Sequence, residues 1–246
     1  MNRLTVIFLL ALAAVTAGCS IDANGVFTDD TSEQYRLYDY YIDDYGNEGI
    51  VVYLSSKNDP HQIIVLSADE YYAPWGPMGE TVYKGDSVSR DVIEGYNAYS
   101  FGVAVHQAMH AAGIERYPAQ AWCNSKNNGE LHPRGGSWRL PSYYEWRLIM
   151  KLDNTYSWDK HALPEINSAL RLTGGTPLAA DHIYWTCTED FEGYLSFKEH
   201  EADFDRQNRA VIVSPEGKSY SNKDRWIKKN NYYVRAIKYV YFKSYK

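Results

Sequence analysis

The stretch that decides the fold is Gly136-Ser137-Trp138-Arg139-Leu140-Pro141-Ser142-Tyr143-Tyr144-Glu145. Ser142, followed three residues later by Glu145, forms a capping box. In such a box the serine oxygen accepts a hydrogen bond from a free backbone N–H, and the glutamate accepts one from the serine's own N–H. The stretch therefore predicts a helix that begins after Ser142 and continues to about Leu152.

The pattern on both sides of this helix indicates the fold class. More helices are expected around it, and β-branched or alternating runs are expected to form strands before and after it. Strands, then helices, then strands, without βαβ alternation, indicate an α+β fold with antiparallel strands at both ends and a helical middle. The expected helices cover 101–112 (with Ser100 as N-cap), 119–124 and 164–172, and the expected strands cover 38–43, 50–54, 63–66, 183–185, 193–197, 210–213 and 232–237.

The N-terminus has the pattern of a secretion signal. Arg3 precedes an uncharged apolar run over residues 4–17, which is 14 residues long. A bilayer core of about 30 Å needs about 20 residues to span it, so this run is too short for a membrane helix. It fits the apolar region of a signal peptide.

The end of that run, Ala17-Gly18-Cys19, resembles the lipobox of bacterial lipoproteins. The resemblance implies that Cys19 carries the lipid (palmitate) and becomes the mature N-terminus. Because Ser20 follows it, the expected place is the outer membrane. An ordinary signal peptide cleaved nearby is the alternative. The chain then divides into a lipoprotein signal peptide over 1–18, a polar tether over 19–34 and a single domain over 35–246.

Composition excludes several classes of protein and singles out tyrosine. The chain has 23 Tyr against 7 Phe and 7 Trp, 45% hydrophobic residues and a net charge of −6. This composition excludes disordered, collagen-like and polytopic membrane proteins, and the acidic balance argues against nucleic acid as a partner. Tyrosine pairs suit contact with sugars or proteins because each ring adds a hydroxyl to a flat apolar face. The candidate ligand-binding residues are Tyr40, Tyr71, Tyr72, Tyr143 and Tyr144.

Charge is unevenly distributed along the chain. Residues 22–70 hold eleven acids and two bases, whereas residues 218–246 hold nine bases and one acid. The pattern predicts that the first and last strands lie side by side with opposite charges facing each other. A bipolar surface for a charged partner is the alternative.

Three segments together resemble a known family. They are the opening stretch, Tyr184-Trp185-Thr186-Cys187-Thr188-Glu189 and Tyr233-Val234-Arg235-Ala236-Ile237. In this order they resemble the collagen-like adhesin C-terminal domain family, also called the major paralogous domain. That family belongs to the formylglycine-generating-enzyme-like branch of the C-type-lectin-like fold. The resemblance implies a C-type-lectin-like domain whose two ends lie on neighbouring strands.

Within these motifs, four residues are expected to be structural. Trp138 and Trp185 are interpreted as core aromatics, and Arg139 and Arg235 as hydrogen-bond donors at a buried edge. The family pattern itself implies little activity, since one fold hosts many functions.

Metal and catalytic patterns are weak. His106 and His110 have the spacing of zinc ligands on a helix, but Gln107 replaces the glutamate of a zincin and no third ligand is evident. Asp203 and Asp205 offer oxygens but lack the glycine and closing glutamate of a calcium loop. We therefore expect no metal, no cofactor and no enzymatic activity.

Two cysteines remain in the expected domain, Cys123 and Cys187. In an oxidising envelope they either pair as a disulfide or stay as two buried thiols. Spacing does not decide between these alternatives.

The sequence thus predicts a lipoprotein of the cell envelope, anchored in the outer membrane on its periplasmic or cell-surface face, that acts as a binding or adhesion module for a glycan or a protein. Its contact with the membrane is the lipid on Cys19. A structural or assembly component of the envelope or of a surface appendage is the alternative.

Overall fold

A computed structural model of the chain describes residues 20–21, 27–28, 35–55, 62–82, 98–129, 131, 136–151, 162–189, 207–215 and 227–241. Several predictions fall outside these residues. They concern the signal peptide, Cys19, most of the tether, the strand at 193–197, Asp203 and Asp205. Among the described residues, no helix has the length and apolar character needed to cross a membrane.

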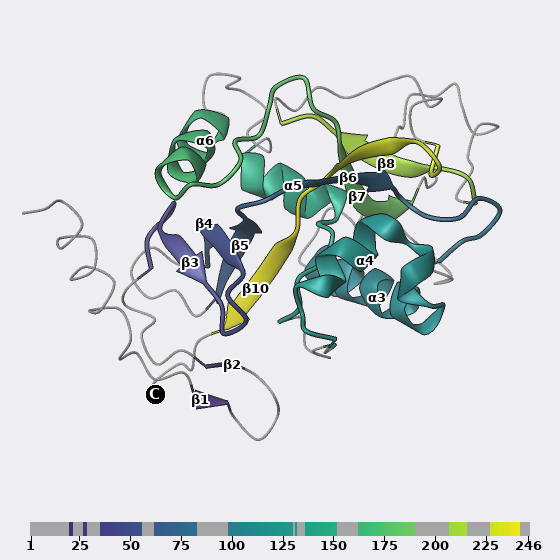
Figure 1. Ribbon diagram of the computed structural model, residues 1–246, viewed down its shortest axis with the longest axis horizontal. Helices are drawn as coiled ribbons and strands as arrows, with labels where there is room; N and C mark the ends of the chain where they lie inside the picture. The colour runs from purple at the N-terminus through teal and green to yellow at the C-terminus, as the bar shows by residue number, and fades with distance from the viewer. Residues whose placement is uncertain are drawn as a thin grey trace, which may run out of the picture.

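Within the described residues, the strands form two sheets, and four α-helices lie between the early and the late strands in the sequence (Figure 1). In the first sheet the order is β1 (Ser20–Ile21), β2 (Phe27–Thr28), β10 (Ile237–Tyr241), β5 (Gln62–Ser67), β4 (Glu48–Leu54), β3 (Tyr40–Ile42). In the second it is β6 (Tyr71–Pro74), β9 (Asn231–Val234), β7 (Tyr184–Glu189), β8 (Ala210–Val213). The helices are α3 (Ala98–Ala111), α4 (Pro118–Ser125), α5 (Tyr143–Met150) and α6 (Leu163–Leu172). The predicted α+β class is confirmed.

The capping box at the start of α5 is formed as predicted. Ser142 Oγ accepts from the N–H of Glu145 at 3.3 Å, and the Glu145 carboxylate accepts from the N–H of Ser142 at 2.7 Å. Lys151 ends the helix in the left-handed conformation, with φ 55°. The helix therefore stops slightly before the predicted Leu152.

The start of α3 differs from the prediction. Ser100 was expected to be the N-cap, but it lies inside the helix, which begins at Ala98. Tyr99 packs against Tyr239 of β10, with ring centroids 4.5 Å apart. This tertiary contact stabilises an additional turn that the periodicity starting at Phe101 does not indicate.

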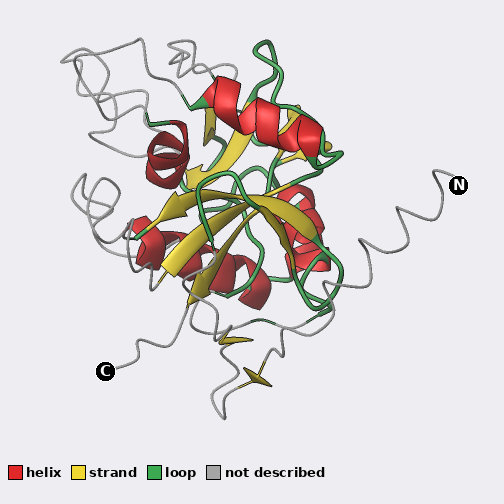
Figure 2. Ribbon diagram, turned by 90° about the vertical axis from the view of Figure 1, so that its left-hand side faces the viewer, coloured by secondary structure: helices red, strands yellow, loops and turns green. Residues whose placement is uncertain are grey.

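The central strands of the first sheet are buried on both faces. Val51, Ile63 and Val65 belong to one hydrophobic cluster, whereas neighbours such as Ile64 and Leu66 belong to a second. Helices lie on opposite sides of the strands (Figure 2), which explains why β4 and β5 are continuous apolar runs in the sequence.

The interpretation of the two tryptophans is also confirmed. Trp138 and Trp185 are fully buried in the first of these clusters.

The chain crosses between the two sheets twice at the same place. The sequence predicts one strand over 232–237, but β9 belongs to the second sheet and β10 to the first. The other crossing leads from β5 through Ala68 to β6. Arg235 lies in the crossing from β9 to β10 and donates to two carbonyls of the other crossing, Ser67 O at 3.0 Å and Ala68 O at 2.9 Å. The predicted role of Arg235 as a buried hydrogen-bond donor is confirmed.

Opposite charges from the two ends of the chain meet at this sheet. Strand β10 lies between β2 and β5, both in the acid-rich part of the chain, and not against the expected strand at 38–43. Lys238 of β10 nevertheless reaches Asp43, with Nζ 3.1 Å from Oδ2. The long side chain of Lys238 therefore reaches an acidic residue next to β3, although β10 and β3 are not neighbours in the sheet.

Candidate functional site

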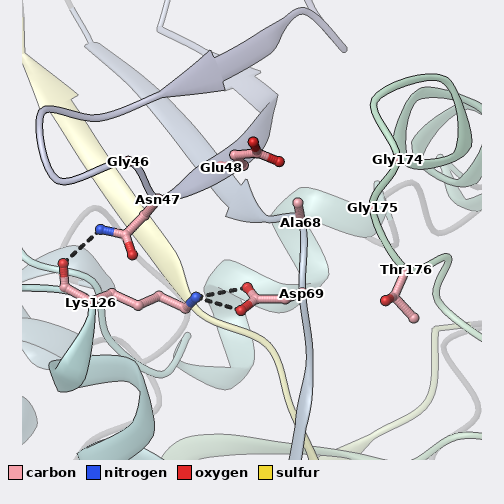
Figure 3. A pocket seen from close by; sticks show the side chains of 9 residues that line it. All are labelled: Gly46, Asn47, Glu48, Ala68, Asp69, Lys126, Gly174, Gly175 and Thr176. Carbon is pink, nitrogen blue, oxygen red and sulfur yellow. Dashed lines mark hydrogen bonds and ion pairs between the residues drawn. The ribbon is translucent and has the colours of Figure 1, made fainter.

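A polar cavity of about 290 Å³ opens beside the crossing from β5 to β6 (Figure 3). Four separate segments form it: the β3–β4 turn, the start of the crossing, the end of α4 and the loop after α6. The lining residues are Gly46, Asn47, Glu48, Ala68, Asp69, Lys126, Gly174, Gly175 and Thr176.

The wall formed by the β3–β4 turn is held in place by Asp43. Its carboxylate accepts from the backbone N–H of Asn47 at 2.9 Å and from Trp138 Nε1 at 2.7 Å. Burial acts to raise the pKa of Asp43, but Lys238 and these hydrogen bonds outweigh burial and lower it. Asn47 in turn donates to the backbone carbonyl of Lys126 at 2.8 Å, which fixes the turn against the end of α4.

The opposite part of the cavity contains an ion pair with two aromatic rings beside it. Lys126 Nζ lies 2.7 Å from both carboxylate oxygens of Asp69 and 4.6 Å from the ring centroid of Trp122. Tyr71 stacks on Trp122, with centroids 5.7 Å apart and planes at 10°. Asp69 and Tyr71 both remain exposed: the side chain of Asp69 is 56% exposed, and the whole residue Tyr71 is 47% exposed. A ligand in the cavity therefore meets a fixed carboxylate. The exposed ring of Tyr71 lies outside the lining and is connected to it through Trp122 and Lys126.

Contacts alternate along the segment that contains this ion pair. Asp69 and Tyr71 contact residues of α4 or its end, whereas Glu70 contacts Arg235 at 2.9 Å. Tyr72 packs against Tyr233 of β9, with ring centroids 5.0 Å apart. Successive side chains of an extended segment point to opposite sides, so adjacent residues of this segment contact different parts of the molecule.

The side opposite α4 is a separate aromatic cluster. His182 stacks on Tyr233 at 3.5 Å between centroids, and its Nδ1 lies 3.3 Å from Glu70. Glu70 also accepts from the hydroxyl of Tyr184 at 2.8 Å. Tyr72, although exposed, belongs to this cluster and not to the cavity.

The structure connects two of the five candidate tyrosines to the cavity. Tyr71 is linked through Trp122 and Lys126, as described above. Tyr40 hydrogen bonds Glu48 of the cavity wall, and burial followed by this carboxylate raises the pKa of Tyr40.

The remaining three tyrosines lie in other surroundings. Tyr72 is in the opposite cluster, Tyr143 packs against both hydrophobic clusters, and Tyr144 lies on α5 away from the cavity lining. A prediction that rests on tyrosine pairs missed the polar residues of the lining and the tryptophan beside it. Besides Asn47 and Thr176, which also line the cavity, these are Glu48, Asp69 and Lys126 of the lining and Trp122 beside it.

The histidine pair does not form an accessible site. His106 is only 3% exposed, and its Nε2 lies 3.3 Å from Asn124 Oδ1, whereas His110 is exposed. Burial, followed by the charge of Arg139, lowers the pKa of His106 to about 4. In the described part of the chain, no group of three or more His, Cys, Asp or Glu residues could hold a metal ion.

The cysteines do not form the disulfide considered from the sequence. Cys123 and Cys187 are free and buried in the first hydrophobic cluster. Burial raises the pKa of both thiols. The alternative of two buried thiols therefore describes them correctly, and each fills core volume as a small apolar side chain.

Comparisons with known proteins show the fold alone. No family model matches the chain, and no curated protein sequence matches it. The chain is similar in structure to a fimbrial protein from Bacteroides ovatus, with 13% identity and a TM-score of 0.53. The match covers 84% of this chain and 49% of the fimbrial protein, so the chain spans about half the length of that protein.

Proposed function

We propose that this chain is an exported, cell-surface binding protein whose ligand enters the cavity beside Asp69. The observation that carries the proposal is the Asp69–Lys126 ion pair next to the exposed ring of Tyr71. Ligand sites are concave and combine apolar contact area with a few fixed polar groups. The proposal includes no catalytic activity.

Three observations support a location at the cell surface. The N-terminal pattern predicts export and a lipid on Cys19, which would anchor the chain in the outer membrane. The motifs around Trp138 and Trp185 resemble an adhesin-domain family with a C-type-lectin-like fold. A fimbrial protein shares the fold, which supports a role connected with surface structures.

The binding proposal is tested with residues 20–246 and two variants of the same strand. Tyr71→Ala removes the ring that stacks on Trp122 beside the cavity, and Tyr72→Ala removes a ring of similar exposure on the opposite side. We expect a glycan array or a panel of purified envelope proteins to give a ligand that binds the native chain and Tyr72→Ala. Tyr71→Ala is expected to lose most of that binding. Blank results for the native chain, or equal loss in both variants, would overturn the proposal.

A second candidate is a structural or assembly component of a surface appendage. The observation in its favour is the fold shared with the fimbrial protein. A deletion strain is expected to have fewer or shorter appendages under this candidate. Normal appendages in that strain, imaged by electron microscopy, would argue against it.

The anchor is tested separately from either function. Cys19→Ala is expected to abolish labelling by a palmitate analogue and to release the chain from the membrane fraction. Unchanged labelling and fractionation would contradict the lipid anchor.

A further inference from the structure

The backbone of the cavity offers few free hydrogen-bond donors. Seven of the nine lining residues already donate their N–H groups within the chain. These residues are Gly46, Asn47, Ala68, Lys126, Gly174, Gly175 and Thr176. Sites for anions are instead built from backbone N–H groups that point at the ligand. The cavity is therefore poorly suited to an anionic group.

The side-chain donors of the cavity are also largely engaged. Lys126 Nζ binds both oxygens of Asp69 at 2.7 Å. The amide nitrogen of Asn47 donates to the carbonyl of Lys126 at 2.8 Å and to Asp43 at 3.0 Å. What the lining presents to a ligand is thus mainly acceptor oxygens, from Asp69, Glu48 and the hydroxyl of Thr176.

The charge of the lining favours a cation. Glu48 and Asp69 contribute two negative charges, and Lys126 contributes one positive charge, so one negative charge remains. The whole chain carries a net charge of −6, which adds to the attraction. Tyr71 lies outside the lining, but it is 47% exposed and stacks on Trp122, the ring that lies against Lys126. A basic chain that leaves the cavity on this side meets the ring, to whose face a cation is attracted.

We infer that the cavity binds the ammonium or guanidinium group of a basic side chain presented by a protein partner. This inference rests on the proposed binding function and names its ligand class. A lysine or arginine side chain supplies further donors to these carboxylate and hydroxyl oxygens, each of which can accept more than one hydrogen bond. Its aliphatic part lies toward Tyr71 where the chain leaves the cavity. A protein partner is favoured over a neutral saccharide because the saccharide gains nothing from the unbalanced negative charge.

The test uses a short, end-capped peptide with one central lysine, titrated into residues 20–246 by calorimetry. The matched probe is the same peptide with Nε-acetyl-lysine, which has the same length without the charge. We expect saturable binding of the lysine peptide, weakened by added salt, and no binding of the acetylated peptide.

Two variants are expected to act in opposite directions on this binding. Glu48→Gln makes the lining neutral and should weaken binding about threefold. Lys126→Gln leaves both carboxylates and should strengthen binding by a similar factor, about threefold. The control is Glu165→Gln on α6, which changes the net charge equally at an exposed residue outside the lining and should have no effect. Thermal unfolding of each variant verifies that it is folded.

The outcomes separate this inference from the proposed function. Equal binding of both peptides, or changes of the same sign in both cavity variants, would overturn the inference. If glucosamine binds and the lysine peptide does not, the assignment of a protein partner is overturned. If the binding of a glycan or protein ligand is lost in Tyr71→Ala but unchanged in Glu48→Gln, the proposed function stands and only the inference fails.

Discussion

Two neighbouring carboxylates at the sheet crossing have different surroundings. Glu70 pairs with Arg235, and their side chains are 10% and 0% exposed. Asp69, one residue earlier, pairs with Lys126, and their side chains are 56% and 9% exposed. The two ion pairs have similar distances, 2.9 Å and 2.7 Å. Burial, and not contact distance, therefore distinguishes the pair that stabilises the fold from the pair that is available to a ligand.

The buried pair has partners that the exposed pair lacks. Arg235 donates to the backbone carbonyls of Ser67, Ala68 and Thr176, in addition to Glu70. Ser67 is the last residue of β5, Ala68 follows it, and Thr176 lies in the loop after α6, so the guanidinium satisfies acceptors at the end of the sheet ladder and beyond it. One side chain thereby connects both sheet crossings and the wall of the cavity.

The largest expected effect is the loss of Arg235. Arg235→Met removes the cation that pairs with Glu70 and takes one donor from each of the three backbone carbonyls. We expect a loss of about 3–5 kcal/mol in the free energy of unfolding, because Glu70 then stays charged without its buried partner. Lys126→Met, at the exposed pair, should cost no more than about 1 kcal/mol. Urea denaturation of both variants measures the difference. Losses of equal size would contradict the distinction between the two pairs.

The second expected effect depends on pH and on buried His106. Its pKa is about 4 in the folded chain, below the usual value of 6.5, because burial and then Arg139 disfavour its charged form. The unfolded chain therefore binds a proton between pH 6.5 and 4 that the folded chain does not bind. The contribution of His106 to the free energy of unfolding should be fully present above pH 6.5. It should decrease by about 3 kcal/mol as the pH falls to about 4.

The matched variants isolate the contribution of His106. Substitution His106→Gln, which retains a side chain able to donate to Asn124, should flatten this part of the pH profile. His110→Gln, at an exposed position on the same helix, should leave the profile unchanged. The carboxylate of Asp43, whose pKa is lowered, contributes only at lower pH. A pH profile of His106→Gln that matches the native one would show that another group titrates here.

The third prediction concerns the loss of stability when either of two adjacent glycines in the cavity wall is substituted. A Cβ at Gly175 would lie 2.9 Å from Ala68 O, a backbone atom held by Arg235. Gly175→Ala should therefore cost about 1–3 kcal/mol through overpacking. At Gly174, with φ +81°, a Cβ would meet nothing within 4 Å. Gly174→Asn should cost less than about 1 kcal/mol, since asparagine tolerates the left-handed region. Thermal unfolding compares the two, and a larger loss for Gly174→Asn would be the contrary result.

Local sequence patterns predicted much of this fold because their causes are local. The capping box at Ser142 and Glu145 involves four consecutive residues, and it forms as predicted. The apolar runs at 50–54 and 63–66 appear as β4 and β5. The division of the predicted strand at 232–237 was not visible, because the change of sheet depends on Arg235 finding acceptors far away in the sequence.

The cavity could be predicted only in part, for the same reason. It joins four segments, and no local pattern indicates that Lys126 will meet Asp69. The sequence singles out the tyrosine pair at 71 and 72, but the alternation of an extended strand places the two rings in different environments. Applied to that segment, the period of two would have grouped Asp69 with Tyr71 and left Tyr72 out.

The smallest expected effect concerns the response of the two ion pairs to salt. A double-mutant cycle with Asp69→Asn and Lys126→Gln should give a coupling of about 0.2–1 kcal/mol at low ionic strength. Exposed charges are screened over about 3 Å at 1 M salt, so this coupling should approach zero there. The coupling of Glu70 with Arg235, measured with Glu70→Gln and Arg235→Met, should be larger and nearly independent of salt, because buried charges are screened much less. An Asp69–Lys126 coupling that persists at 1 M salt would mean that this pair is structural as well, and that the cavity is not free to exchange the Lys126 contact for a ligand.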